Sequence, residues 1–227
     1  NTYGSNNFAV GACALLNNKT GNSNTAIGQS ALYNNTSGCF NTAIGQQALY
    51  NNTTGSNNIA IGFCAMQCNT TGQHNYALGA WALAVNTGGS YNTAIGFCAL
   101  YSNINANCNV AIGAYALKST TCGVFNIAIG ANALCLNQTG NHNFAAGVQA
   151  LLCNATGCNT AIGYQALYGN TTGFNNIAIG YGSMKASTVG VNNVGLGSQT
   201  LYNNTSGVNN FAVGCVALYA NTSGSNN

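Results

Sequence analysis

The chain has 227 residues, of which 47% are hydrophobic and 1% are charged, and its only ionic side chains at neutral pH are Lys19, Lys118 and Lys185. Without any Asp or Glu it cannot assemble a carboxylate pair, a Ser-His-Asp triad or an ordinary calcium or magnesium site, so we predict no enzymatic activity and no cofactor. A formal charge of +3 is too small to attract nucleic acid, and no apolar run approaches the roughly 18 residues that a membrane-spanning helix needs, so neither nucleic-acid binding nor membrane insertion by this segment is expected.

One short phrase recurs from the first residues to the last, as in NTAIGQQALYNNTTG at 41–55. The glycine that closes each Ala-Ile-Gly-like triplet, here called the corner glycine, recurs every 17 residues except for one step of 16. The thirteen corner glycines are Gly11, Gly28, Gly45, Gly62, Gly79, Gly96, Gly113, Gly130, Gly147, Gly163, Gly180, Gly197 and Gly214. Such a period predicts stacked repeats that fill the whole chain.

Five further positions are nearly constant relative to the corner glycine. The strand asparagine lies four residues before it, an alanine two before it and an aliphatic residue one before it. The core leucine lies four residues after it, and the turn glycine ten after it. We expect these positions to form ladders through the stack, represented by Asn24, Asn41, Asn58, Gly28, Gly45, Gly62, Ile27, Ile44, Ile61, Leu32, Leu49 and Met66.

These features predict an all-β fold, a parallel β-solenoid of about 13 coils with 17 residues each, in a single domain over residues 1–227. We expect two short strands per coil, one over the Asn-x-Ala-Ile-Gly part and one over the Ala-Leu-Tyr part, joined by Asn-Asn-Thr-Thr-Gly turns. The Ile and Leu ladders should form a thin core, and the strand asparagines an amide ladder. At roughly 4.8 Å per coil the stack would be about 62 Å long. Because the chain opens and closes within a coil, we expect a piece of a longer fibre.

Near-neutrality follows from such a stack. An ionised residue at a repeated position would face its own copy about 4.8 Å away and be repelled in every coil. Helices are not expected, because 30 glycines and abundant Asn oppose them and no helical apolar period is present.

Eleven cysteines suit an oxidising, extracellular setting without forming a regular framework. Cys135 and Cys153 fall at near-equal positions in adjacent coils and are the best candidate disulfide, while most of the others are expected to be small apolar fillers. His74 and His142 share one repeat position four coils apart, so we expect surface histidines and no shared metal.

The turn contains a second candidate modification. Seven residues after the corner glycine, nine coils present Asn followed two residues later by Ser or Thr, which fits the N-glycosylation acceptor pattern but also suits the turn itself. These candidates are Asn18, Asn35, Asn52, Asn69, Asn137, Asn154, Asn170, Asn204 and Asn221, with overlapping matches at Asn34, Asn51 and Asn203. Five residues after the glycine stands a row of tyrosines that could bind glycan, stack on a neighbouring chain or merely cover the sheet edge: Tyr33, Tyr50, Tyr101, Tyr168, Tyr202 and Tyr219.

The phrase NTAIG followed by AL, at 24–32, 41–49, 92–100 and 159–167, resembles the head repeats of trimeric autotransporter adhesins and the repetitive fibres of some phages and environmental bacteria. The resemblance covers essentially the whole chain, although the motif is short and the 17-residue coil is longer than the usual head repeat. It implies a left-handed parallel β-roll, association of three chains, and a surface that binds host matrix or other cells.

We therefore expect a structural extracellular or cell-surface fibre subunit with an adhesive or display role, glycosylated and assembling head to tail with copies of itself. Glycans or a host surface are the other expected partners. A phage or virus tail-fibre shaft is one alternative. An ice-binding solenoid is another, favoured by threonine ladders such as Thr53, Thr70 and Thr171 and weakened by Gly88, Asn105 and Cys122 in the threonine row.

Overall fold

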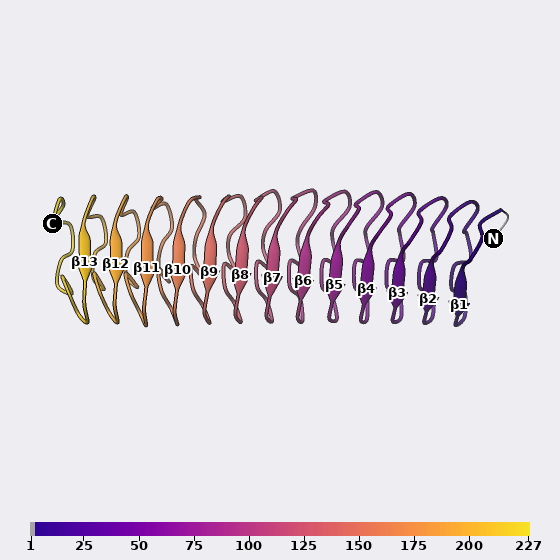
Figure 1. Ribbon diagram of the computed structural model, residues 1–227, viewed down its shortest axis with the longest axis horizontal. Coiled ribbons are helices and arrows are strands. Elements are labelled where there is room, and N and C mark those ends of the chain that lie inside the picture. Colours follow the sequence, from indigo (N-terminus) through magenta and orange to yellow (C-terminus); the bar gives the residue numbers. More distant parts are fainter. Residues whose placement is uncertain (1–2) are drawn as a thin grey trace. The chain divides into compact units, whose positions relative to one another are not determined.

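The computed structural model describes residues 3–227, and all regular secondary structure in that part of the chain is β. Thirteen parallel strands of three residues each, one per repeat, stack as a β-solenoid (Figure 1). The chain forms two compact units, Asn1–Ala114 and Tyr115–Asn227. The predicted fold class is confirmed; its handedness and the single-domain organisation stay predictions.

The first unit contains seven strands that pair in chain order and in register, so that Ala43 lies opposite Ala60. They are β1 (Phe8–Val10), β2 (Thr25–Ile27), β3 (Thr42–Ile44), β4 (Ile59–Ile61), β5 (Tyr76–Leu78), β6 (Thr93–Ile95) and β7 (Val110–Ile112).

The second unit contains six strands with the same parallel pairing. They are β8 (Ile127–Ile129), β9 (Phe144–Ala146), β10 (Thr160–Ile162), β11 (Ile177–Ile179), β12 (Val194–Leu196) and β13 (Phe211–Val213). The 16-residue repeat leaves the register intact, with Ala145 opposite Ala161. Its turn is one residue shorter, and the Thr156 carbonyl accepts the bonds that the turn glycine accepts elsewhere.

The core is built from alanine and leucine. Ala43, Ala48 and Leu49 are fully buried, whereas Ile44 is half-buried and Ile61 is 38% exposed. The predicted isoleucine ladder of Ile27, Ile44 and Ile61 therefore lies on the outside of the coil. Side chains alternate along a strand, so an inward strand asparagine and alanine force the residues beside them outward.

The Ala-Leu-Tyr segment is a turn, and the prediction of a second strand is wrong. Its residues alternate between right- and left-handed conformations, with φ of 57° at Gln47 and 52° at Leu49. The N–H groups of these two residues point to opposite neighbouring coils, because Gln47 donates to Gln29 O at 2.9 Å and Leu49 to Ala65 O at 3.0 Å. Ala48 between them donates within its own coil, to Gly45 O at 3.3 Å. The left-handed conformation costs about 1–2 kcal/mol per residue, which burial of the leucine, at about 1.5–3 kcal/mol, and these bonds offset.

Two rows of glycine are required for different reasons. Gly45, a corner glycine, has φ of +133°, and a Cβ there would lie 2.5 Å from Gly62 O in the next coil. Gly55, a turn glycine, has an ordinary φ, but a Cβ there would also lie 2.5 Å from a carbonyl oxygen, that of Gly72. The first row needs both a special backbone conformation and space, and the second needs space alone.

Candidate functional site

The interior of each unit contains amide ladders. The strand asparagine Asn41 donates from its backbone N–H and its Nδ2 to Asn24 Oδ1, at 3.0 and 3.1 Å, and from Nδ2 to Gly55 O at 2.9 Å. Asn41 is fully buried, and a buried amide group without a hydrogen-bond partner would destabilise the fold. Each of these bonds removes that cost for one amide group.

A second ladder runs through the asparagine seven residues after the corner glycine, here called the turn asparagine. Asn52 Nδ2 donates to Asn35 Oδ1 at 2.8 Å and to Gly55 O at 2.9 Å. The Gly55 carbonyl therefore accepts from both ladders and ties them together.

This ladder changes the glycosylation prediction. The turn asparagines Asn18, Asn35, Asn52, Asn69, Asn137, Asn154, Asn170 and Asn204 are at most 2% exposed. A glycan on such a nitrogen would remove one of its two donor hydrogens and could not fit in the interior, so the folded coil does not offer these acceptors. Asn221 is half-buried, and its Nδ2 is bonded to Asn204 Oδ1 and Gly224 O. The overlapping matches Asn34, Asn51 and Asn203 lie one residue earlier and are half-exposed.

The turn-asparagine ladder is interrupted in the second unit at Ser187. Asn170 Oδ1 and Ser187 Oγ are both buried without a hydrogen-bond partner among residues 3–227. A serine side chain is shorter than an asparagine and cannot reach the carbonyl one coil away. This break is a local weak point of the ladder.

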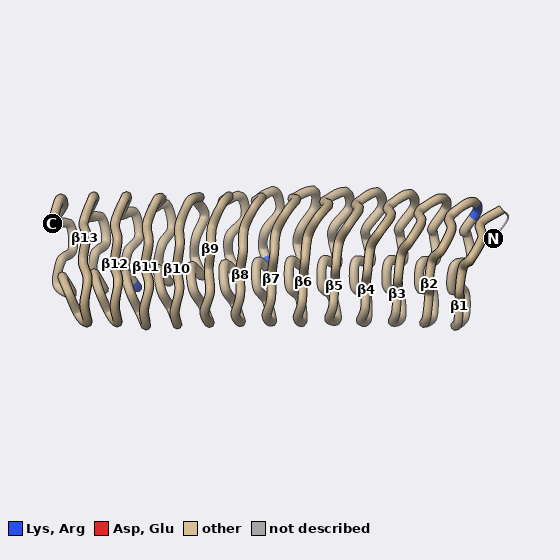
Figure 2. Tube along the Cα trace, viewed as in Figure 1, with Lys and Arg blue, Asp and Glu red and all other residues tan. Residues whose placement is uncertain are grey.

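The residues one and three positions before the corner glycine form what we call the outer strand face. In the first unit the row one position before the glycine is aliphatic in every strand, with exposures of 37% at Leu78, 38% at Ile95 and 37% at Ile112. The row three positions before it is mixed, because Tyr76 is 45% exposed there but β2, β3 and β6 have threonine. The face carries no charged side chain, because Lys19 lies in a turn and the other two lysines lie five residues after a corner glycine (Figure 2). Six inter-strand steps of about 4.8 Å and a strand length of about 10 Å give it an area of roughly 300 Å².

The tyrosine row is partly stacked. Tyr33 packs on Tyr50 with ring centroids 5.0 Å apart, and Tyr202 packs on Tyr219 at 5.1 Å. Lys185 occupies the same row, with its Nζ 5.9 and 5.8 Å from the ring centroids of Tyr168 and Tyr202.

Each histidine stacks on an aromatic ring within its own unit. The ring centroids of His74 and Tyr91 are 4.9 Å apart, and those of His142 and Phe125 are 5.2 Å apart. Residues 3–227 contain no group of three or more His, Cys, Asp or Glu side chains that could hold a metal ion.

The structure describes all eleven cysteines as free thiols, and the disulfide between Cys135 and Cys153 stays a prediction. The two lie five and six residues after their corner glycines, and this difference of one position gives them different environments: Cys135 is buried and Cys153 half-buried. Burial raises the pKa of both thiols, and Lys118 partly opposes the rise in the pKa of Cys135. Burial, followed by the neighbouring Cys68 thiolate, raises the pKa of Cys64.

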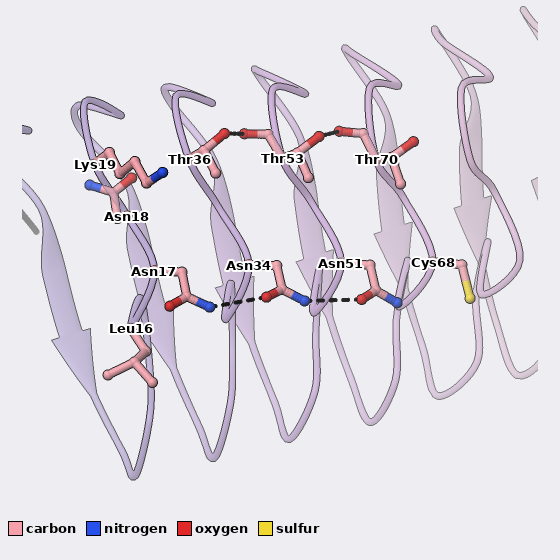
Figure 3. A pocket seen from close by; sticks show the side chains of 10 residues that line it. All are labelled: Leu16, Asn17, Asn18, Lys19, Asn34, Thr36, Asn51, Thr53, Cys68 and Thr70. Carbon is pink, nitrogen blue, oxygen red and sulfur yellow. Dashed lines mark hydrogen bonds between the residues drawn. The ribbon is translucent and has the colours of Figure 1, made fainter.

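The first unit also contains a polar groove of about 740 Å³ over its first four coils (Figure 3). One wall is the row six residues after the corner glycine, with Asn17, Asn34 and Asn51, and the other is the row eight residues after it, with Thr36 and Thr53. Lys19 and Leu16 lie at one end, and Cys68 and Thr70 at the other. Neither row follows from the constant positions of the repeat, but both are visible in the sequence as Asn-Asn-Thr turns at 34–36 and 51–53.

Comparisons of the chain with protein-family models, with curated proteins and with solved structures found no match. Across residues 3–227 there is no helix of the length and apolarity required to cross a membrane.

Proposed function

We propose that this chain is a structural segment of an extracellular or cell-surface fibre, with an adhesive or display role carried by its repeated outer rows. The observation that carries the proposal is the pair of interior amide ladders. A single coil cannot satisfy its own buried amides, because each accepts from or donates to the coil beside it, so stability comes from extension of the stack. A fold that gains stability by adding coils suits a spacer or fibre.

Self-association is part of the proposal, and the outer strand face supports it. Its exposed aliphatic row is contiguous over seven strands, and the largest apolar patch of a soluble protein is often functional. A second copy repeats its rows at the same coil spacing, so contacts made in one coil recur in the next, whereas a partner with another spacing loses register. With no charge on the outer face of the first unit, nothing repels an approaching copy.

The test is sedimentation velocity of the full chain over a range of concentrations, combined with negative-stain electron microscopy. We expect association that increases with concentration and is lost in Ile61→Lys, which places a charge on β4, in the centre of the outer face of the first unit. Thr54→Lys adds the same charge at an exposed turn position and should associate like the wild type. A wild-type chain that stays monomeric at high concentration would contradict the self-association.

The resemblance to adhesin heads and phage fibres is compatible with this function, and a tail-fibre shaft remains the second candidate within it. The ice-binding alternative receives no support from the threonine row, because Thr53 and Thr70 turn their hydroxyl hydrogens to backbone carbonyls at 3.0 and 2.9 Å.

A further inference from the structure

We infer that the polar groove of the first unit binds an extended, neutral glycan chain that runs along the stack. This inference rests on the adhesive part of the proposed function and names the ligand class for it. It is argued from the hydrogen-bonding groups that the two walls leave unused.

The asparagine wall offers both donors and acceptors. Asn17 Nδ2 donates to Asn34 Oδ1 and Asn34 Nδ2 donates to Asn51 Oδ1, each at 3.1 Å (Figure 3). An asparagine amide has two N–H groups and two carbonyl lone pairs, so Asn34 keeps one of each. The ladder stops at Asn51 because the next coil has Cys68 at this position, which leaves the amide of Asn51 with two N–H groups to offer.

The threonine wall offers acceptors alone. Thr36 Oγ1 donates to Thr53 O at 2.9 Å, and Thr53 Oγ1 donates to Thr70 O at 3.0 Å. Each hydroxyl hydrogen is thereby used within the protein, and the oxygen lone pairs remain. The two middle coils of the groove thus repeat one set of amide groups facing one hydroxyl oxygen, about 4.8 Å apart. The first coil adds the amide of Asn17 and the fourth adds the hydroxyl of Thr70.

A neutral polyhydroxylated chain matches this pattern. Each sugar hydroxyl both donates and accepts, and a pyranose in an extended chain is about as long as one coil step. Nucleic acid is excluded, because its phosphates need several cations and the groove has only Lys19. An extended peptide repeats its side chains on one face every ~6.8 Å and falls out of step with rungs spaced ~4.8 Å apart.

The experiment is isothermal titration calorimetry of the full chain with β-1,4-linked cello-oligosaccharides of two to six units. The groove spans three coil steps, or about 14 Å, so affinity should rise with length up to about four units and then level off. Asn34→Ala and Thr53→Val should each weaken binding about three- to tenfold, since each removes one or two neutral hydrogen bonds.

The matched controls are Asn203→Ala and Thr205→Val, which make the same changes at the same repeat positions in the second unit. They should leave binding unchanged, and circular dichroism of all four variants checks that loss of binding is not loss of fold. Equal loss in the control pair, or no binding of any oligosaccharide at millimolar concentration, would overturn the inference. Binding of oligogalacturonate alone, abolished by Lys19→Gln, would also overturn it, since a lone charge and not the ladders would then select the ligand. Self-association is measured separately by sedimentation velocity, so a chain that does not associate can still be tested for glycan binding in the groove.

Discussion

Replacing Gly45 by alanine probes how tightly the coils are stacked. At φ of +133° an L-residue is strained, by about 1–3 kcal/mol. The added Cβ would also lie 2.5 Å from Gly62 O and 2.7 Å from Gly62 C. These are backbone atoms held in place by the bond from Gly62 N to Ile44 O at 2.8 Å, so they cannot move away cheaply. Overpacking adds about 1–3 kcal/mol, giving about 2–6 kcal/mol in total.

Gly214→Ala is the matched control. Gly214 occupies the same repeat position with φ of +115°, but none of the atoms of residues 3–227 would lie within 4 Å of its Cβ, apart from its chain neighbours. Only the conformational strain remains there, about 1–3 kcal/mol. The difference between the two variants therefore isolates the contact with the next coil.

The assay is native-state hydrogen exchange read by mass spectrometry, because unfolding of a repeat array need not be two-state. We expect Gly45→Ala to lower the opening free energy of amides in β3 and β4 by more than Gly214→Ala lowers that of amides in β12 and β13. Equal losses in the two variants would refute the claim that the neighbouring coil excludes a Cβ.

Three further outcomes follow from the ladders and the buried thiols. Ser187→Asn should stabilise the second unit by about 1–3 kcal/mol, since it supplies a donor to the orphaned carbonyl one coil away, and a lower or unchanged denaturation midpoint would argue against the ladder break. Iodoacetamide labelling at pH 8 should modify exposed Cys122 before buried Cys64, because the raised pKa of Cys64 favours its unreactive thiol form. The Cys64 thiol ionises at lower pH in the unfolded chain than in the folded one. Its contribution to stability is therefore complete below the unfolded pKa and is lost as pH rises through the folded pKa. After expression in a glycosylating host, peptide mass spectrometry should find glycan on Asn203 and none on Asn204, and the reverse occupancy would show that the turn asparagine is accessible when it is modified.

The sequence by itself determined the solenoid, its period and its neutrality. A strict 17-residue repeat leaves one way to bury a constant set of positions, which is to stack each on its copy, and charge cannot be tolerated at repeated positions. The positive φ of the corner glycine could also be anticipated, because glycine at a fixed position signals a backbone that other residues resist.

Only the tertiary structure decided which side chains point into the coil and which point outward. Ile44 and Ala43 are both apolar, and the alternation of side chains along a strand whose asparagine points inward turns Ala43 inward and Ile44 outward. Asn34 and Asn35 both match the glycosylation pattern, but of these two only Asn35 is buried, where its Nδ2 donates to Asn18 Oδ1 and Gly38 O. The sequence shows which residue types occupy each repeat position. The backbone conformation along the coil decides which of these side chains point into the ladders and which point outward, toward a ligand or another chain.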